Sequence, residues 1–255
     1  MPTLPLQLIL LFIVGIVSGF INILAGGGSL LALPVLIFLG LPATVANGTN
    51  RIAILIQNVA AIAGFHQQKV FPWRLSLLAA IPATLGAVLG ANLALDISEA
   101  RFKQILAGVM LAILILTISD PTRKIHATPQ ALTGFRLVIF IVGFFGVGVF
   151  GGFIQAGVGF IIISVMLVTG FDLVATNAVK VLVTFIFTIA ALVIFIAHAQ
   201  VDYLFGVVLG LGSAAGGWVG TRFSVKKGHH WIRAFVIVMV VIFSAKLLWD
   251  SLFTQ

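Results

Sequence analysis

The stretch ILAGGGSLLALP (residues 23–34) places three consecutive glycines inside an apolar run that otherwise has the pattern of one membrane helix. Glycine costs roughly 1 kcal/mol relative to alanine in a helix interior, so Gly26, Gly27 and Gly28 together predict a helix break. Irregular backbone at membrane depth must be surrounded by protein or by a water-filled cavity. The sequence therefore predicts an interior site at this break.

The composition is that of an integral membrane protein. Of the 255 residues, 61% are hydrophobic and 8% are charged, whereas soluble domains carry about 25% charged residues. Apolar stretches of about 20 residues, long enough for a helix to cross the hydrocarbon layer, recur along the chain. The first stretch lacks a preceding Lys or Arg and an A-x-A-like cleavage site, so we expect a retained helix. We predict an all-α membrane fold.

The chain divides into two similar halves around the polar interval SDPTRKIHATPQ (119–130). We predict a first transmembrane repeat at 1–119, a polar linker at 120–134 and a second transmembrane repeat at 135–255. Apolar segments are expected at 4–24, 29–40, 43–64, 74–95, 103–119, 135–155, 159–170, 173–197, 203–222 and 231–250.

Matching motifs indicate an internal duplication. The break AGGGS (25–29) corresponds to AGVGF (156–160), and a Thr-Asn pair follows each break, at Thr49-Asn50 and Thr176-Asn177. Small-residue pairs spaced for helix packing also correspond, including Gly86/Gly90 and Gly216/Gly220. Each half therefore contains one Gly-interrupted helix in the same place.

Loop charge indicates that the repeats are inverted, because cytoplasmic loops collect Lys and Arg. An even number of crossings per half divides the loop cations evenly between the two sides. An odd number places Lys69, Arg74, Arg123, Lys124, Arg136, Arg222, Lys226, Lys227 and Arg233 on one side, against Arg101, Lys103 and Lys246 on the other. We therefore expect inverted repeats with both termini outside the cytoplasm. Segments 29–40 and 159–170 either re-enter or cross while tilted, and both alternatives keep this parity; we expect the re-entrant or broken form.

Inverted repeats with interrupted helices at matching positions are typical of transporters that bind substrate near the bilayer midplane. A helix that starts inside the membrane presents free N–H groups and a positive dipole end, which attract anions. The candidate binding residues are Asn22, Gly26, Gly27, Gly28, Ser29, Thr49, Asn50, Arg51, Gln155, Gly157, Gly159, Thr176, Asn177 and Lys180. Intramembrane cations are functional by default, so Arg51 and Lys180 are expected to attract the anion; the alternative is that they snorkel or pair with backbone carbonyls.

Other chemistries lack the residues that they need. All six carboxylates lie at predicted segment ends (Asp96, Glu99, Asp120, Asp172, Asp202 and Asp250), and cysteine is absent. We therefore expect no metal site, no cofactor and no enzymatic activity. The net charge of +8 is scattered through short loops, which fits membrane orientation rather than nucleic-acid binding. The expected partners are a small anion and the lipid bilayer, and a homo-oligomer is left open.

The motif GFINILAGGGSLLALPVLIFLGLPA (19–43), followed by Thr49-Asn50, with a second copy GGFIQAGVGF (151–160) and GFDLVATN (170–177), resembles the sulfite exporter TauE/SafE family. The resemblance covers essentially the whole chain. It implies an inner-membrane permease that exports sulfite or an organosulfonate; an importer of a related sulfur compound and an anion channel are the alternatives. The second copy departs from a triple glycine at Val158.

Overall fold

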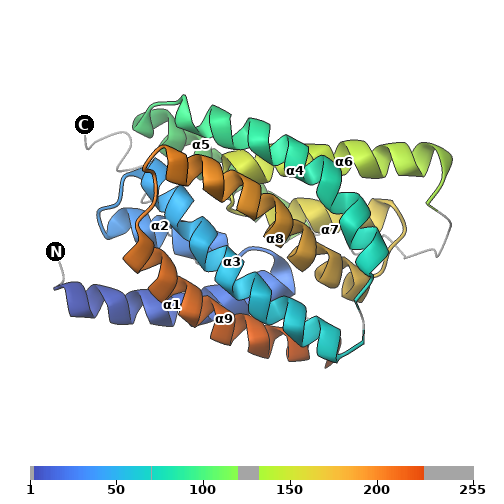
Figure 1. Cartoon of the computed structure of the whole chain (residues 1–255), viewed down its shortest axis with the longest axis horizontal. Coiled ribbons are helices and arrows are strands. Elements are labelled where there is room, and N and C mark those ends of the chain that lie inside the picture. The colour runs from blue at the N-terminus through green and yellow to red at the C-terminus, as the bar shows by residue number, and fades with distance from the viewer. Residues whose placement is uncertain (1–2, 70, 120–131, 227–255) are drawn as a thin grey trace.

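The computed structural model describes residues 3–69, 71–119 and 132–226, and the regular elements of this part are all α-helices (Figure 1). In chain order they are α1 (Leu4–Ala25), α2 (Ser29–Phe38), α3 (Ala43–Gln67), α4 (Trp73–Leu95), α5 (Glu99–Ser119), α6 (Gly134–Phe153), α7 (Val158–Val168), α8 (Leu173–Ala197) and α9 (Tyr203–Lys226). The predicted all-α fold is confirmed. The predicted segment 231–250 and most of the predicted linker lie outside the described residues.

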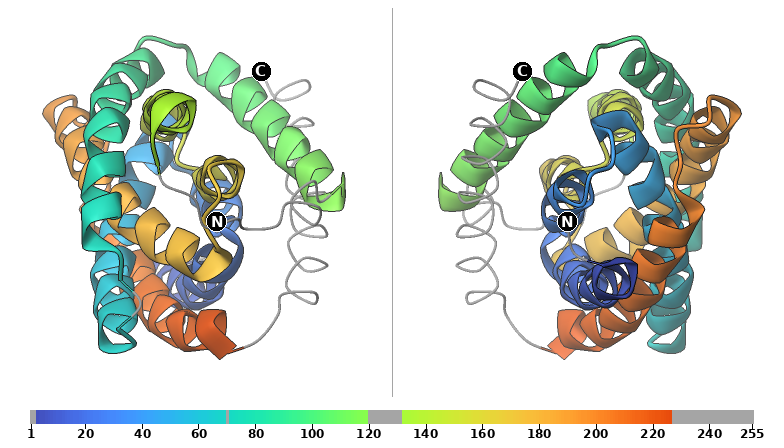
Figure 2. Two further views of the ribbon diagram at one scale, coloured as in Figure 1. Left: turned by 90° about the vertical axis from the view of Figure 1, so that its right-hand side faces the viewer. Right: turned by 90° about the vertical axis from the view of Figure 1, so that its left-hand side faces the viewer.

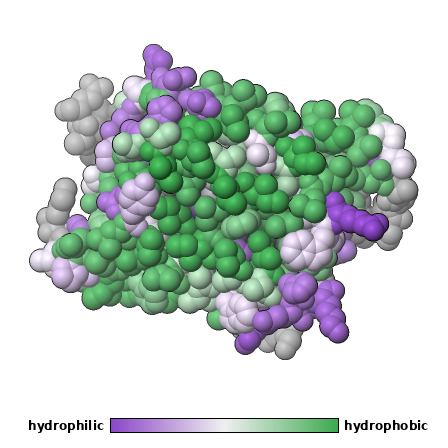
Figure 3. Space-filling view, in the orientation of Figure 1, coloured by the Kyte–Doolittle hydropathy of each residue, from purple (hydrophilic) through white to green (hydrophobic). Residues whose placement is uncertain are grey.

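The chain is a multi-pass membrane protein. The described helices that are long and apolar enough to cross a membrane are Leu4–Leu24, Trp73–Leu95, Gly134–Phe153, Val174–Ala197 and Tyr203–Ser224. The face seen in Figure 3 is apolar along most of its length, and hydrophilic residues gather toward the two ends of the long axis. The helices run between those ends, so the long axis corresponds to the membrane normal.

Small residues let α1 pack closely against α9, and α4 against α6. A Cβ on Gly15 would lie 2.9 Å from the backbone N of Ser213, and a Cβ on Gly86 would lie 2.7 Å from the backbone N of Val149. Glycine at these positions lets the helix backbones approach closely, as predicted for small-residue pairs. As a result, the fourth helix of each half (α4 or α9) packs on the first helix of the other half (α6 or α1).

The two halves repeat the same local features. The short helices α2 and α7 both end in a turn closed by a backbone bond across five residues, from Leu41 N to Leu36 O (3.2 Å) and from Phe171 N to Met166 O (3.0 Å). In Figure 1, α1 begins at the end of the bundle marked N, whereas α6 begins at the opposite end. This arrangement is consistent with the predicted inverted repeats.

Helices α3 and α8 pack against each other in the interior, and each also contacts a helix of the other half, α9 and α4 respectively. Both run obliquely through the bundle (Figure 1). Seen end-on, α5 lies apart from α4, on the other side of α6 and α7 (Figure 2). The interior helices carry most of the buried polar side chains, so they decide the chemistry of the centre.

Candidate functional site

Two glycine-rich breaks end α1 and α6 inside the bundle, confirming the predicted interruptions. We call residues 22–29 the α1–α2 elbow and residues 151–159 the α6–α7 elbow. Gly26 and Gly157 occupy corresponding positions and have nearly the same left-handed backbone, with φ of 77° and 78°. Side chains with a Cβ rarely adopt this conformation, which explains why glycine stands at both turns.

The two elbows cross in direct backbone contact. A Cβ on Gly26 would lie 2.6 Å from Gly159 Cα, and a Cβ on Gly159 would overlap the Gly26 backbone in turn. The α1–α2 elbow is also tied to α1, because Ser18 Oγ donates to Gly28 O at 2.9 Å. Its first backbone bond on the α2 side is from Leu30 N to Gly27 O (3.0 Å). The Gly26 N–H donates to Asn22 O, whereas those of Gly27, Gly28 and Ser29 have no backbone acceptor among the described residues and form the start of α2.

Lys180 of α8 caps the end of α1. Its ammonium donates to Asn22 O at 3.0 Å, to Ile23 O at 2.9 Å and to Asn177 Oδ1 at 2.8 Å. The side chain is 4% exposed. The carbonyls at a helix C-terminus carry partial negative charge, so a cation there is electrostatically favoured.

Arg51 of α3 caps the end of α6 in the same way. Its guanidinium donates to Gly151 O at 3.1 Å, to Gly152 O, and to Gln155 Oε1 at 2.8 Å. The Phe195 ring covers the guanidinium at 4.5 Å. Each cation thus caps the broken helix of the other half. Both cations pair with backbone carbonyls, which is the alternative that the sequence left open to a direct contact with the anion.

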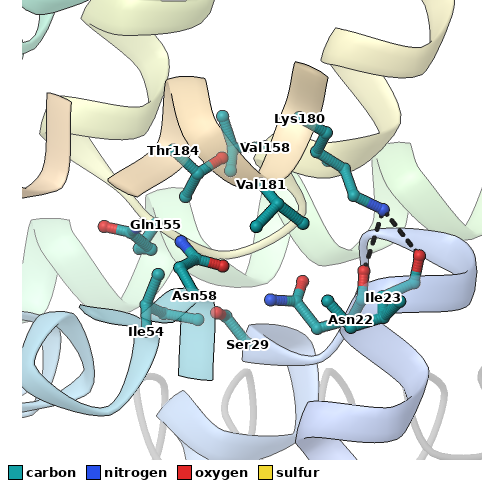
Figure 4. A pocket seen from close by; sticks show the side chains of 11 residues that line it. Asn22, Ile23, Ser29, Ile54, Asn58, Gln155, Val158, Lys180, Val181 and Thr184 are labelled. Carbon is teal, nitrogen blue, oxygen red and sulfur yellow. Dashed lines mark hydrogen bonds between the residues drawn. The ribbon is translucent and has the colours of Figure 1, made fainter. Parts of the chain in front are cut away.

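A small cavity lies where the two elbows meet α3 and α8 (Figure 4). Its volume of about 10 Å³ is about that needed for one water. The lining residues are Asn22, Ile23, Ser29, Ile54, Asn58, Gln155, Val158, Gly159, Lys180, Val181 and Thr184. Figure 4 shows the Lys180 ammonium directed at the Asn22 and Ile23 carbonyls at one side of this cavity.

The cavity is rich in hydrogen-bond donors. Asn58 is 2% exposed, and its Nδ2 has no hydrogen-bond partner among the described residues. Gln155 Nε2 donates to Thr188 Oγ1 at 2.9 Å, and Asn22 Nδ2 donates to Gln57 Oε1 at 3.2 Å. Of the described residues that line the cavity, one is cationic and none is acidic. Such a site can hold an anion or a neutral acceptor, and a metal cation would find no carboxylate on this lining.

The predicted site residues fall into two groups. Those that line the cavity are Asn22, Ser29, Gln155, Gly159 and Lys180. The others are not among the lining residues: Gly26, Gly27, Gly28, Thr49, Asn50, Arg51, Gly157, Thr176 and Asn177.

Three polar members of the second group hold other parts of the protein in place. Asn50 Nδ2 donates to Ser29 Oγ at 3.1 Å and so positions a lining hydroxyl. Thr49 Oγ1 accepts from Asp202 N at 2.8 Å, which ties α3 to the α8–α9 turn. Asn177 Nδ2 donates to Ser224 Oγ at 3.0 Å.

Two polar lining residues, Asn58 and Thr184, were not among the candidates. Asn58 lies seven residues after Arg51 and Thr184 lies four after Lys180, so each shares a helix face with a predicted residue. Following that spacing inward from the two cations would have found both of them.

This geometry, with two broken helices crossing at a polar cavity inside a bundle of membrane helices, is the architecture of a membrane transporter. Residues 11–247 match the family described as "Sulfite exporter TauE/SafE". The chain belongs to this family and is a membrane transporter of the TauE/SafE type.

Relatives with assigned names support the same class. The chain is 29% identical to a "probable membrane transporter protein" of Haemophilus influenzae, over 96% of this chain and 95% of that one. It is also 29% identical to the "probable membrane transporter protein YfcA" of Escherichia coli K12, over 97% and 91% respectively. The similarity extends to YunE of Bacillus subtilis, a "probable membrane transporter protein", at 20% identity over 98% of this chain and 100% of that one. No solved structure matches the chain.

Proposed function

We propose that the chain is a secondary transporter that exports a small anion such as sulfite or an organosulfonate, bound near the midplane in the cavity between the elbows. The observation that carries this proposal is the lining itself, in which Lys180 is joined by amide and hydroxyl groups and by no carboxylate of the described residues. The unpartnered Nδ2 of buried Asn58 supports it further, because a buried donor without an acceptor is costly and an anionic oxygen would supply one.

The cavity size favours a carrier over a channel. A volume of about 10 Å³ holds about one water, whereas sulfite has four heavy atoms. The elbows must therefore move apart for an anion to bind, as in alternating access between two repeats. The proposed repeats at 1–119 and 135–255 each contribute one elbow to this movement.

The orientation is proposed from the charges at the two ends of the bundle. Lys69, Arg74, Arg136 and Arg222 belong to helix ends or turns at one end, and Arg101 and Lys103 begin α5 at the other (Figure 1). Because basic residues collect in the cytoplasm, the first end is cytoplasmic and the termini are outside, in an inner membrane. A negative interior favours anion exit by about 2.3 kcal/mol per charge per 100 mV, which is compatible with export.

Sulfite and organosulfonate flux in proteoliposomes tests this function. The wild type should show saturable flux, and Asn58→Leu should lower the apparent affinity roughly tenfold, the cost of one hydrogen bond to a charged group. Asn92→Leu is the matched control, because Asn92 is exposed on α4 and bonds only to Val88 O in the described structure. Absence of flux would refute the function. Flux that rises linearly with concentration would favour a channel, and inward accumulation would favour an importer.

A further inference from the structure

Lys180 has no N–H left for a ligand. An ammonium carries three donors, and those of Lys180 bond to Asn22 O, Ile23 O and Asn177 Oδ1 at 2.8–3.0 Å. The same side chain lines the cavity, where it is the one cation among the described lining residues. An anion that enters the cavity therefore competes with the end of α1 for the same N–H groups.

The balance of charge favours the anion in this competition. The C-terminal end of a helix is equivalent to about half a negative charge, whereas an anionic substrate carries at least a full one. The lysine stem is long and flexible, so its ammonium can turn from one acceptor to another. Two of its three hydrogen bonds are to carbonyls at the end of α1. When the ammonium turns to the anion, this end of α1 loses these two bonds.

The α6–α7 elbow is held differently. Arg51 is 0% exposed and does not line the cavity, and the ring of Phe195 covers its guanidinium. Its bonds to Gly151 O and Gly152 O are reinforced by Asn47, whose Nδ2 donates to Phe153 O at 2.9 Å. An anion in the cavity does not meet these donors.

We propose that Lys180 is a latch on the α1–α2 elbow that the anion releases, whereas Arg51 keeps the α6–α7 elbow closed throughout the cycle. The two halves thus have the same architecture and different tasks, one moving and one fixed. This inference rests on the proposed function, because the releasing ligand is the transported anion. Lys180 is then both a contact to the ligand and the positioning residue of α1.

Hydrogen–deuterium exchange of the full chain in nanodiscs, with and without sulfite, tests the latch. In the wild type, sulfite should speed exchange in peptides of the α1–α2 elbow and leave those of the α6–α7 elbow unchanged. Lys180→Met should speed exchange in the α1–α2 elbow without sulfite, by about tenfold, as expected from losing a charge-assisted hydrogen bond. Sulfite should add nothing further to this variant. Lys103→Met, at a partly exposed surface position, is the matched control and should behave as the wild type.

Three outcomes would overturn the latch, and they are distinguishable from one another. If sulfite flux is saturable but exchange in the α1–α2 elbow stays unchanged or slows, the anion does not release α1. If Lys180→Met exchanges as the wild type, the lysine does not hold α1. If sulfite flux is absent while Lys180→Met still exchanges faster, the proposed function fails and Lys180 is a static cap.

Discussion

Gly26→Ala tests whether the crossing of the two elbows sets the stability of the bundle. Alanine at a φ of 77° carries the left-handed backbone penalty of about 1–2 kcal/mol. The new Cβ would lie 2.6 Å from Gly159 Cα and 2.7 Å from Gly159 C, and backbone atoms cannot rotate away as a flexible side chain can. Overpacking costs about 1–3 kcal/mol, so the expected destabilisation is about 2–5 kcal/mol.

Thermal unfolding of the purified chain in detergent measures this change. With the scaling of soluble domains of about this size, about 2–4 °C per kcal/mol, the Tm should fall by about 4–20 °C. Gly146→Ala is the matched control, because it lies within α6 and nothing approaches within 4 Å of its Cβ position. Removing a glycine from a helix interior there should stabilise by up to about 1 kcal/mol. If Gly26→Ala has the same Tm as the wild type, the two elbows do not cross in backbone contact.

Three further predictions concern the cap, the elbow and the topology. Arg51→Met should lower the free energy of unfolding by about 2–4 kcal/mol, because it leaves buried acceptors unpaired. The control Arg74→Met, at an exposed position, should have the Tm of the wild type. Equal Tm values for Arg51→Met and the wild type would contradict the cap. Ser18→Ala should cost about 1 kcal/mol through loss of its bond to an elbow carbonyl, measurable as a lower Tm. The chain has no cysteine, so single cysteines at exposed positions report topology: Gln67→Cys should label from the cytoplasm and His198→Cys from outside, and the reverse pattern would refute the proposed orientation.

The helices were predictable because their signals are local. Apolar length located the long helices, and the triple glycine at 26–28 and the Gly-Val-Gly at 157–159 located the breaks to within a residue or two. The small-residue spacing at Gly86/Gly90 predicted a close helix contact, although not that its partner would be α6 of the other half. Such partner choice depends on shape complementarity between distant segments, which no local pattern carries.

The candidate site was predictable in its location and not in the task of each side chain. Charge and burial marked Arg51 and Lys180 as residues that need partners, but carbonyls far away in the chain could supply them as well as a ligand could. Backbone acceptors have no sequence signature, since every residue has a carbonyl. Asn58 could be linked to the cavity by its helical spacing from Arg51. That spacing becomes informative only once Arg51 and Lys180 are known to lie at the centre of the bundle.

Reciprocal capping also imposes an order on biosynthesis. The carbonyls that Arg51 needs lie 100 and 101 residues further along the chain, and at about 5–20 residues per second the ribosome needs about 5–20 s to reach them. Lys180 meets no such delay, because Asn22 was made 158 residues earlier. Until α6 is synthesised, the guanidinium of Arg51 in the first half has no carbonyls to bond to, so it must stay near water or the insertion machinery. A chain truncated before α6 would keep this guanidinium without the carbonyls that accept its hydrogen bonds.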